Sequence, residues 1–571
     1  MVHQIKNNMN EEYDIIVVGA GFGGPVAAKI CADAGLKTLM IERSENVGEK
    51  VISGLTIPFQ GFLLGPAFIR DGNPPFERPS DGVINYIIKD IDTSDIDIDD
   101  SLRFPKPLSP IFAFGYNTYC KPFCEWEAKK AIEAGAILRT STTIVDLIKE
   151  NNCVKGVITD SGEEIRSKIV IDAEGSQGLL AIKAGIREKY PPEAISLADT
   201  YDYEMDKEDI DKLFGYSLKF CWGWDEQKIS PPLGYGNGLM VWPYRNSLHF
   251  MQDQCLQLNQ KSVPNLKKLF NDYHHNITTK LDWWKKDIAP RIKLRARMWE
   301  GFEIYVGLDK KLRNMSNHAD GIILIGDVAG LESTELCDGV PAAWWSAEIA
   351  AEVAIEAIRI NNTSKSFLKK YDERIKSHPI IQWSISGRNR YDLREAQEQH
   401  DEKKLKKYIH NGWGLGALTH FTTPFLKLSL SYFNEDPTIL TKWIKMYFRY
   451  YRNWLHESYD YTINRKQRKH NTKRPFVMES LFCNMINILN SLMKFIHRRK
   501  RFLSFLIIPL VNSINTFLKK FLPVIEPIFL KIMKFLEPLT DKISKKMINF
   551  ADRANPLIFE VISTKEVEKF G

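Results

Sequence analysis

The chain has 571 residues, of which 44% are hydrophobic, so it is long enough for two or three domains with buried cores. Its net charge of +7 is uneven, because residues 465–546 carry 18 Lys and Arg against 4 Asp and Glu, whereas the rest carries 60 against 67. The eight cysteines form no CxxC pair and no metal-binding spacing, which argues against a disulfide framework, an iron–sulfur cluster and a metal site. The polar N-terminus lacks the apolar stretch of a secretory signal, so we expect a cytoplasmic protein.

The first elements read as a strand, a glycine-rich turn, a helix and a second strand. Residues 14–18 are an apolar run of β-type residues, and the turn Gly-Ala-Gly-Phe-Gly-Gly follows at 19–24. Apolar residues then keep a helical period until Gly35, after which residues 37–41 predict the second strand, ending in Glu42. This order is typical of a dinucleotide-binding fold.

Each part of this fingerprint has a physical role. Gly19 makes the tight turn, Gly21 lets a pyrophosphate approach the backbone, and Gly24 allows close packing of helix and strand. The helix start supplies unpaired amides for the phosphates, and Glu42 stands where a carboxylate would accept the adenosine ribose hydroxyls. Three neighbours complete the predicted nucleotide contacts: Ala20, Gly23 and Arg43. FAD and NAD share this pattern, so the choice between them depends on later segments.

Two later segments favour FAD. Residues 165–171 form a strand that ends in Asp-Ala-Glu-Gly at 172–175, and residues 321–325 form a strand that runs into Gly326-Asp327, with a helix from about Val340. Together with the N-terminal glycines, these segments resemble the FAD oxidoreductases with the glutathione-reductase-type fold, a Rossmann-like α/β fold. The resemblance implies that Asp327 binds the ribityl chain and that the helix start directs its amides to the flavin. Without this resemblance, the Gly-Asp pair would be interpreted as an ordinary turn at the end of a strand.

A narrower resemblance rests on two segments, NVGEKVISGLTIP at 46–58 and YCKPFCEWEAKKAIEAGA at 119–136. Both are similar to segments of the electron-transfer-flavoprotein:quinone oxidoreductases, the FixC-type proteins and the archaeal geranylgeranyl reductases. In those families Arg usually stands where this chain has Lys121. The resemblance places these residues at the FAD: Ser53, Gly54, Lys121, Glu174, Gly175, Gly326, Asp327, Gly339 and Val340.

The segment order divides the chain into five parts. The resemblance implies that residues 1–189 and 321–360 make the FAD-binding domain. It also implies that residues 190–320, which are rich in Trp, Tyr and Pro, form an inserted mixed-sheet domain that covers the flavin and forms the substrate cavity. A helical region at 361–469 and a basic amphipathic tail at 470–571 complete the α-helical C-terminal extension.

The catalytic group is not determined by the sequence. Weak candidates lie just before the helix at Val340: Glu335, Cys337 and Asp338. Cys120 and Cys124 are one helical turn apart and are either a redox pair or unlinked thiols in a packed turn. A second glycine-rich nucleotide motif is missing, so we expect electrons from a donor protein or from transiently bound NAD(P)H.

The sequence of the tail predicts that the protein acts at a membrane surface. Its apolar stripe, its basic cluster at 497–501 and amphipathic segments such as residues 521–539 fit a helix lying on an anionic membrane surface. Residues 502–518 lack charge but contain Pro and Asn, so spanning the membrane is a weaker alternative, as is a helical subdomain packed on the body or a partner. No nucleic-acid recognition module is visible.

A flavoenzyme on a membrane favours an apolar substrate. We expect an FAD-dependent oxidoreductase that reduces double bonds of an isoprenoid lipid, as the resemblance to geranylgeranyl reductases implies. Three alternatives remain open: FixC-like electron transfer to a quinone, a flavin monooxygenase, and a non-catalytic prenyl-lipid-binding protein. The intact phosphate-binding glycines weigh against the last of these.

Overall fold

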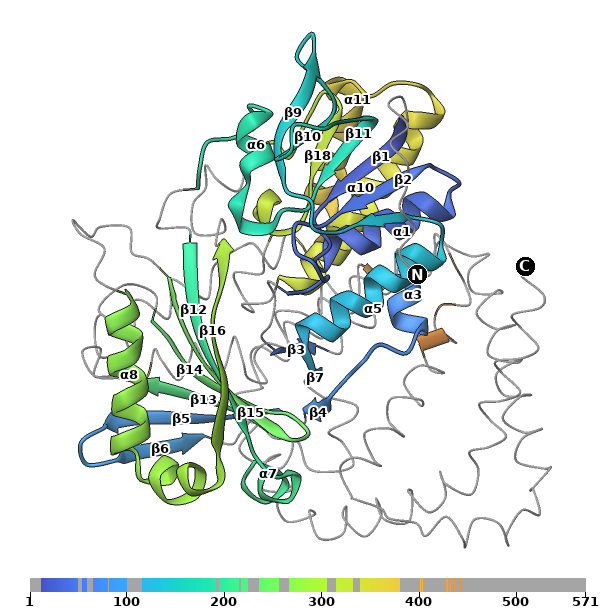
Figure 1. Cartoon of the computed structure of the whole chain (residues 1–571). Helices are drawn as coiled ribbons and strands as arrows, with labels where there is room; N and C mark the ends of the chain where they lie inside the picture. The colour runs from blue at the N-terminus through green and yellow to red at the C-terminus, as the bar shows by residue number, and fades with distance from the viewer. Residues whose placement is uncertain are drawn as a thin grey trace, which may run out of the picture.

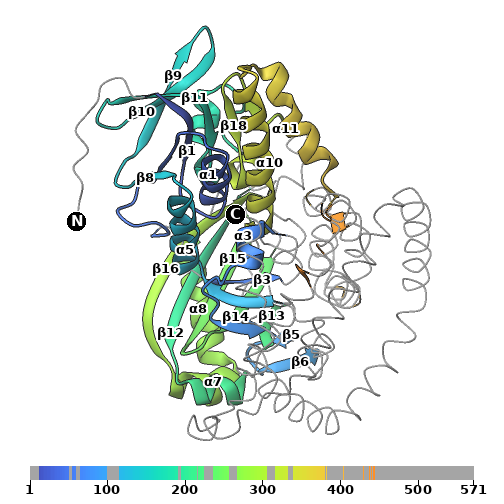
Figure 2. The same ribbon diagram turned by 90° about the vertical axis from the view of Figure 1, so that its right-hand side faces the viewer.

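Two large β-sheets organise the molecule, which we describe from a computed structural model (Figure 1). The structure describes residues 12–49, 54–58, 65–80, 82–99, 115–190, 195–214, 217–223, 236–255, 266–304, 315–331 and 339–379, with a few isolated positions from 381 to 443. In both views the β9–β10 hairpin (Ile144–Glu150 and Cys153–Thr159) and α7 (Lys207–Leu213) lie at opposite ends of the molecule (Figure 2).

The first sheet has eight strands, six of them in the order β17-β18-β11-β1-β2-β8. Strands β1 (Tyr13–Val18), β2 (Thr38–Ile41), β8 (Ile137–Arg139), β11 (Glu164–Asp172) and β18 (Ile322–Leu324) run parallel, whereas β17 (His318–Ala319) pairs antiparallel with β18. The hairpin β9–β10 extends β11. Continuous β-branched runs build the central strands, as expected where helices cover a parallel sheet. The three strands predicted at 14–18, 37–41 and 165–171 are confirmed.

Four helices pack around this sheet: α1 (Gly23–Asp33), α5 (Cys120–Glu133), α10 (Val340–Arg359) and α11 (Lys365–Ser377). Helix α1 contacts both α5 and α10, and α11 contacts α10 and β17. Small residues make this close packing possible, since Ala347, Ala350 and Ala354 of α10 are fully buried. The helix predicted from about Val340 begins at that residue. This part of the chain confirms the α/β FAD-binding fold class.

The second sheet has seven strands in the order β16-β12-β15-β14-β13-β5-β6. Their bounds are Lys293–Ile304 (β16), Ile195–Glu204 (β12), Ser247–Cys255 (β15), Gly236–Pro243 (β14), Ser217–Gly223 (β13), Gly82–Asp90 (β5) and Asp95–Asp99 (β6). Helix α8 (Leu266–Lys280) lies along one face (Figure 1), where Tyr201, Phe250 and Ile277 belong to a second hydrophobic core.

The chain enters the second sheet earlier than residue 190. Strand β5 pairs in parallel with β13, and β6 pairs with β5 at the sheet edge. Residues 82–99, which the sequence assigned to the first part of the FAD-binding domain, therefore build this sheet together with residues 195–304.

A small sheet in the order β3-β7-β4 lies between the two large ones (Figure 1). It consists of β3 (Gly54–Pro58), β7 (Gly115–Tyr119) and β4 (Arg78–Ser80), and β7 continues directly into α5. Short helices α3 (Ala67–Asp71) and α6 (Leu179–Lys183) complete the elements near the first sheet.

Several predictions concern residues outside this description. Ser53, residues 332–338 and the whole tail at 470–571 are among them, as is the uncharged stretch 502–518. Within the ranges given above, no helix combines the length and the apolar character that crossing a bilayer requires.

Candidate FAD site

The glycine turn connects the carboxyl end of β1 to the start of α1. Gly19 has a φ of +103°, and a Cβ built there would lie 2.3 Å from the Ala173 carbonyl oxygen. A Cβ on Gly24 would lie 1.9 Å from the Gly19 carbonyl oxygen. In contrast, a Cβ on Gly21 would meet no atom within 4 Å. Gly19 and Gly24 are therefore required by the fold itself, and Gly21 leaves the open approach that a pyrophosphate needs.

The start of α1 presents its amides beside this opening. No side chain caps the helix at Phe22, and the first turn carries no acidic residue, so the amides and the helix dipole favour an anion there. A Cβ on Gly23 would lie 3.2 Å from the Ile325 side chain, which explains how closely the helix approaches the end of β18.

Glu42 stands directly beyond β2 and reaches back to the glycine turn. Its Oε2 accepts a hydrogen bond from the Ala20 amide at 2.9 Å, and its Oε1 accepts one from the Ser44 amide at 3.0 Å. The carboxylate is thus held at the edge of the turn, and its ribose contact stays a prediction. The neighbouring Arg43 is exposed and donates to Gln177 Oε1 at 3.0 Å, which links this strand end to the turn after β11.

The turns after β11 and β18 meet at the same sheet edge. Gly175 has a φ of +74°, and a Cβ there would lie 4.0 Å from the Asp327 carboxylate. Glu174 Oε2 accepts a hydrogen bond from the Leu180 amide at 2.9 Å, which fixes the turn onto α6. Three segments that are far apart in the sequence, at 19–24, 172–175 and 326–327, therefore converge, as the resemblance to FAD oxidoreductases implied.

The Gly-Asp segment is anchored to the start of α10. Gly326 has a φ of +64°, and its amide donates to Ser346 Oγ at 3.1 Å. Gly339 is the residue before α10, and the first turn from Val340 contains no acidic residue. The unpaired amides of this first turn therefore favour negative charge, and their contact with the flavin stays a prediction.

The narrower resemblance also places Ser53, Gly54 and Lys121 at the FAD, and the structure describes the last two of these. Gly54 begins β3, and a Cβ there would lie 1.7 Å from the hydroxyl oxygen of the fully buried Tyr244. Tyr244, in the turn between β14 and β15, therefore requires glycine at this position. Lys121 is half-buried in the first turn of α5, and its Cα would lie 2.9 Å from a Cβ on Gly48. Its FAD contact stays a prediction.

Cys120 and Cys124 are both buried, and neither forms a disulfide. Burial raises the pKa of the Cys124 thiol well above its usual range, which makes this thiol a poor nucleophile. These observations favour unlinked thiols in a packed turn over a redox pair. The candidates Glu335, Cys337 and Asp338 lie outside the described residues. Within that description, no three His, Cys, Asp or Glu side chains are grouped to hold a metal ion.

A buried carboxyl group on α5 was not foreseen from the sequence. Glu127 is fully buried, and its Oε1 accepts a hydrogen bond from the Trp344 indole nitrogen at 2.7 Å, while Oε2 has no partner. Burial raises the pKa of Glu127 well above its usual range. The bond joins α5 to the second turn of α10. The available signal was an acidic residue on the apolar face of a helix, between Cys124 and Ala131.

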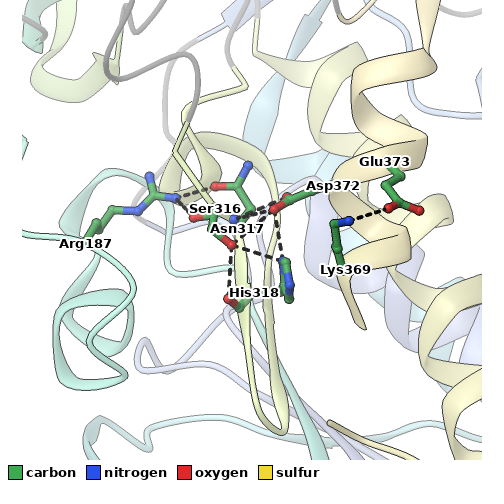
Figure 3. A network of polar contacts seen from close by, with 7 residues as sticks. All are labelled: Arg187, Ser316, Asn317, His318, Lys369, Asp372 and Glu373. Atoms are coloured by element: carbon green, nitrogen blue, oxygen red, sulfur yellow. Dashed lines mark hydrogen bonds and ion pairs between the residues drawn. The ribbon is translucent and has the colours of Figure 1, made fainter. Parts of the chain in front are cut away.

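A second polar network joins α11 to the residues at and just before β17 (Figure 3). Asp372 of α11 accepts hydrogen bonds from the Asn317 amide at 3.2 Å and from Ser316 Oγ at 3.1 Å. Arg187 donates to the Asn317 side chain, and burial lowers the pKa of its guanidinium to about 10. Arg187 also lies 5.1 Å from the ring centre of Tyr190.

This network is connected to the predicted ribityl-binding turn. Tyr190 donates to the Val328 carbonyl oxygen at 3.3 Å, one residue beyond Asp327. Asp172 lies near the same guanidinium, and burial, followed by the charge of Glu174, raises the pKa of Asp172 well above its usual range. Pattern analysis missed Arg187 and Tyr190 because their partners lie far away in the sequence: Asn317 is 130 positions from Arg187, and Val328 is 138 positions from Tyr190.

A polar cluster joins the small sheet to the second large sheet. The Tyr119 hydroxyl contacts Ser247 Oγ and accepts from Arg295 at 2.9 Å. Arg295 also pairs with Asp202, whose Oδ1 lies 2.8 Å from His249 Nε2. Burial acts to raise the pKa of Asp202, but His249 and Arg295 outweigh it and hold that pKa below its usual value.

Methionines form a row on the same face of the second sheet. The strand register places Met240 opposite Met251, Met251 opposite Thr200, and Thr200 opposite Met298, across β14, β15, β12 and β16. The three methionines are between 6% and 9% exposed and belong to neither hydrophobic core described above.

The orientation of this row follows from its neighbours. Tyr201 and Phe250, each one residue away along its strand, point to the opposite face beneath α8. His249, two residues from Met251, is on the face of the row and contacts Tyr119 of the small sheet. The methionine row therefore faces the FAD-binding side of the molecule. In the sequence, methionines spaced along three separate strands gave no recognisable pattern.

Comparison with known proteins agrees with this geometry. The family model described as FAD dependent oxidoreductase matches residues 14–336, which include all three converging segments and end before α10.

Among individual relatives, the chain is similar to the digeranylgeranylglycerophospholipid reductase of Methanocaldococcus jannaschii, with 28% identity over 371 residues, covering 64% of this chain and 83% of the relative. It is equally similar to protein FixC of Azorhizobium caulinodans, with 28% identity over 362 residues, covering 61% and 77%. Among solved structures, a geranylgeranyl bacteriochlorophyll reductase-like protein from Thermoplasma acidophilum superposes with a TM-score of 0.53 at 21% identity, covering 71% of this chain and 97% of that one.

Proposed function

Because the chain belongs to the FAD-dependent oxidoreductase family, we propose that it reduces carbon–carbon double bonds of an isoprenoid lipid at a membrane surface. It is an enzyme and its cofactor is FAD. Bound FAD supplies hydride or single-electron chemistry, and the protein decides which substrate reaches it. The residues that would hold it are the open turn at Gly21, Glu42, Asp327 and the start of α10.

The methionine row is the observation that carries this proposal. Methionine side chains are flexible and polarisable, and they adapt to irregular apolar ligands. Met240, Met251 and Met298 line one face of a sheet that is directed toward the FAD-binding side, next to the Tyr119 cluster. A long prenyl chain needs such a surface, whereas a small polar substrate does not.

Transfer of electrons to a quinone is the second candidate. It is favoured by the equal identity, 28%, to the FixC protein and to the reductase. Both candidates share an apolar substrate and an external electron source, which we propose is a donor protein or transiently bound NAD(P)H.

Anaerobic photoreduction of the purified holoenzyme separates the two candidates. We expect a polyprenyl lipid to reoxidise the flavin with a mass gain of two hydrogens per saturated bond. Rapid reoxidation by a short-chain quinone analogue, with no change in the lipid, would instead assign the quinone function. Reoxidation by neither compound would contradict both.

A further inference from the structure

A buried hydroxyl on α10 holds the Gly-Asp segment from behind. Ser346 lies in the second turn of this helix and is fully buried. Its Oγ accepts a hydrogen bond from the Gly326 amide at 3.1 Å and donates one to the Ala343 carbonyl oxygen at 3.1 Å. Because a backbone amide only donates and a carbonyl only accepts, both roles of the hydroxyl are determined.

Both partners of this hydroxyl stand beside predicted FAD contacts. Gly326 directly precedes Asp327, and Ala343 belongs to the first turn of α10. A Cβ on Gly23, the first residue of α1, would lie 3.4 Å from the Ala343 carbonyl oxygen, and a Cβ on Gly326 would lie 3.4 Å from the Ala343 Cβ. The two hydrogen bonds of Ser346 are therefore located where the start of α1, the start of α10 and the Gly-Asp segment come together.

The Gly-Asp segment is held by bonds from two sides. On the side of β11, the Ile325 amide donates to the Asp172 carbonyl oxygen at 2.9 Å. On the side of α10, the bond between Gly326 and Ser346 follows at the next residue, where the backbone has a φ of +64°. Without the Ser346 hydroxyl, the buried Gly326 amide would lose this acceptor, and the turn would shift to satisfy the amide elsewhere.

We propose that Ser346 is a positioning residue for FAD, which sets Asp327 and the start of α10 in the binding geometry before the cofactor arrives. Ser346 acts through the Gly326 amide and needs no contact with FAD itself. A turn that is already ordered raises affinity, because binding then requires no rearrangement of the protein. This inference rests on the FAD-binding part of the proposed function and is independent of the substrate.

The rate at which FAD leaves the holoenzyme tests this role. Release after dilution is followed by the recovery of flavin fluorescence, at a temperature where all variants are folded. We expect Ser346→Ala to release FAD roughly tenfold faster than the parent protein, the factor that corresponds to one lost hydrogen bond. The melting temperature of the FAD-stripped variant measures separately how much the bond contributes to the fold. A purely structural role would lower this temperature and leave the release rate unchanged.

Ser346→Thr is the conservative variant that should restore FAD retention. It keeps the hydroxyl, and threonine in a helix can direct its Oγ1 to the carbonyl three residues earlier. Its additional methyl group enters a fully packed position, so the FAD-stripped variant should melt at a lower temperature than the parent protein. We therefore expect release close to the parental rate from a less stable protein.

Ser167→Ala is the matched control. Ser167 is 1% exposed on β11 and pairs with Tyr13 at the start of β1, at the end of the strands opposite to the glycine turn. Its Oγ makes no hydrogen bond within the described part of the chain. The control therefore removes a buried serine hydroxyl from the same sheet without removing a hydrogen bond, and it should leave FAD release unchanged.

Three results would overturn the inference. Unchanged release from Ser346→Ala would assign Ser346 a structural role alone. Equally accelerated release from Ser167→Ala would show a general effect of buried substitutions, and release from Ser346→Thr as fast as from Ser346→Ala would assign the effect to packing. Failure of the proposed function is a separate result, in which the release rates follow the expected order while photoreduced enzyme leaves every prenyl double bond intact.

Discussion

Individual glycines in the nucleotide turn have separable tasks. Gly19 and Gly24 are constrained by protein atoms closer than 2.5 Å to a Cβ, whereas Gly21 faces open space. The fingerprint G-x-G-x-x-G therefore combines two folding requirements with one ligand requirement, and substitutions should reveal the difference.

Gly21→Val should lose FAD without losing the fold. The valine side chain would occupy the space that the pyrophosphate needs, and no protein atom lies within 4 Å of the new Cβ. We expect the variant to purify without yellow colour, and its melting temperature to match that of FAD-stripped parent protein. A yellow variant with full flavin occupancy would contradict our assignment of this turn.

Gly24→Ala is the matched control. Its Cβ would lie 1.9 Å from the Gly19 carbonyl oxygen, and overpacking of this kind costs about 1–3 kcal/mol. The control should therefore melt at a lower temperature than FAD-stripped parent protein, whether or not FAD is added.

At the scale of elements, α10 depends on α5 through a buried hydrogen bond. Burial, opposed by the smaller effect of the bond from Trp344, holds the pKa of Glu127 well above its usual range. The folded chain keeps this proton at a pH where the unfolded chain has released it. The contribution of Glu127 to stability is therefore complete below the unfolded pKa of about 4.3 and decreases as pH rises toward the folded pKa.

Glu127→Gln removes this pH dependence, because the amide is neutral and still accepts the indole hydrogen bond. We expect the variant to be close to the parent near pH 4.5 and increasingly more stable toward pH 8, with a slope of at most about 1.4 kcal/mol per pH unit. Urea unfolding at several pH values measures the difference. Glu133→Gln replaces an exposed residue on the same helix and is the control. Its stability difference from the parent protein should not grow as pH rises. Parallel curves for Glu127→Gln and parent would show that Glu127 is ionised in the fold.

Elements with local signals were predictable, and contacts between distant elements were not. The strand at 13–18, the glycine turn and the start of α10 follow from periodicity and turn chemistry, because neighbours in sequence determine them. The Glu127–Trp344 bond joins residues 217 positions apart, and the methionine row arises only when β14, β15, β12 and β16 pair. The order of strands in the second sheet, including its use of residues 82–99, depends on tertiary pairing that local propensity does not encode.

At the scale of the whole molecule, the body is acidic and the tail is basic. We propose that the tail holds the enzyme on anionic membranes while the FAD-binding body performs the reaction. Because the tail lies outside the described residues, this proposal rests on its sequence of alternating apolar segments and basic clusters.

Replacing the four basic residues at 498–501 with glutamine in the full-length protein tests whether the tail binds the membrane. Each basic residue near an anionic surface contributes about 1 kcal/mol, so co-flotation with phosphatidylserine-containing liposomes should fall steeply, while FAD content stays unchanged. The control neutralises four exposed lysines of the body: Lys129, Lys189, Lys268 and Lys369. If the tail variant floats with liposomes as well as the parent protein, or if the control loses flotation to the same extent, the tail is not the membrane anchor.

The pairing of β5 with β13 has a consequence for engineering. Seven residues of β5, from Gly82 to Ile88, lie in register with residues 217–223, yet β5 precedes α5 and most of the first sheet in the chain. A substrate module excised at residue 190 would lack β5 and β6 and would present β13 as a bare edge, open to aggregation. Exchange of substrate specificity with a relative therefore requires two grafts, one carrying residues 82–99 and one carrying residues 195–304, because both segments build the second sheet.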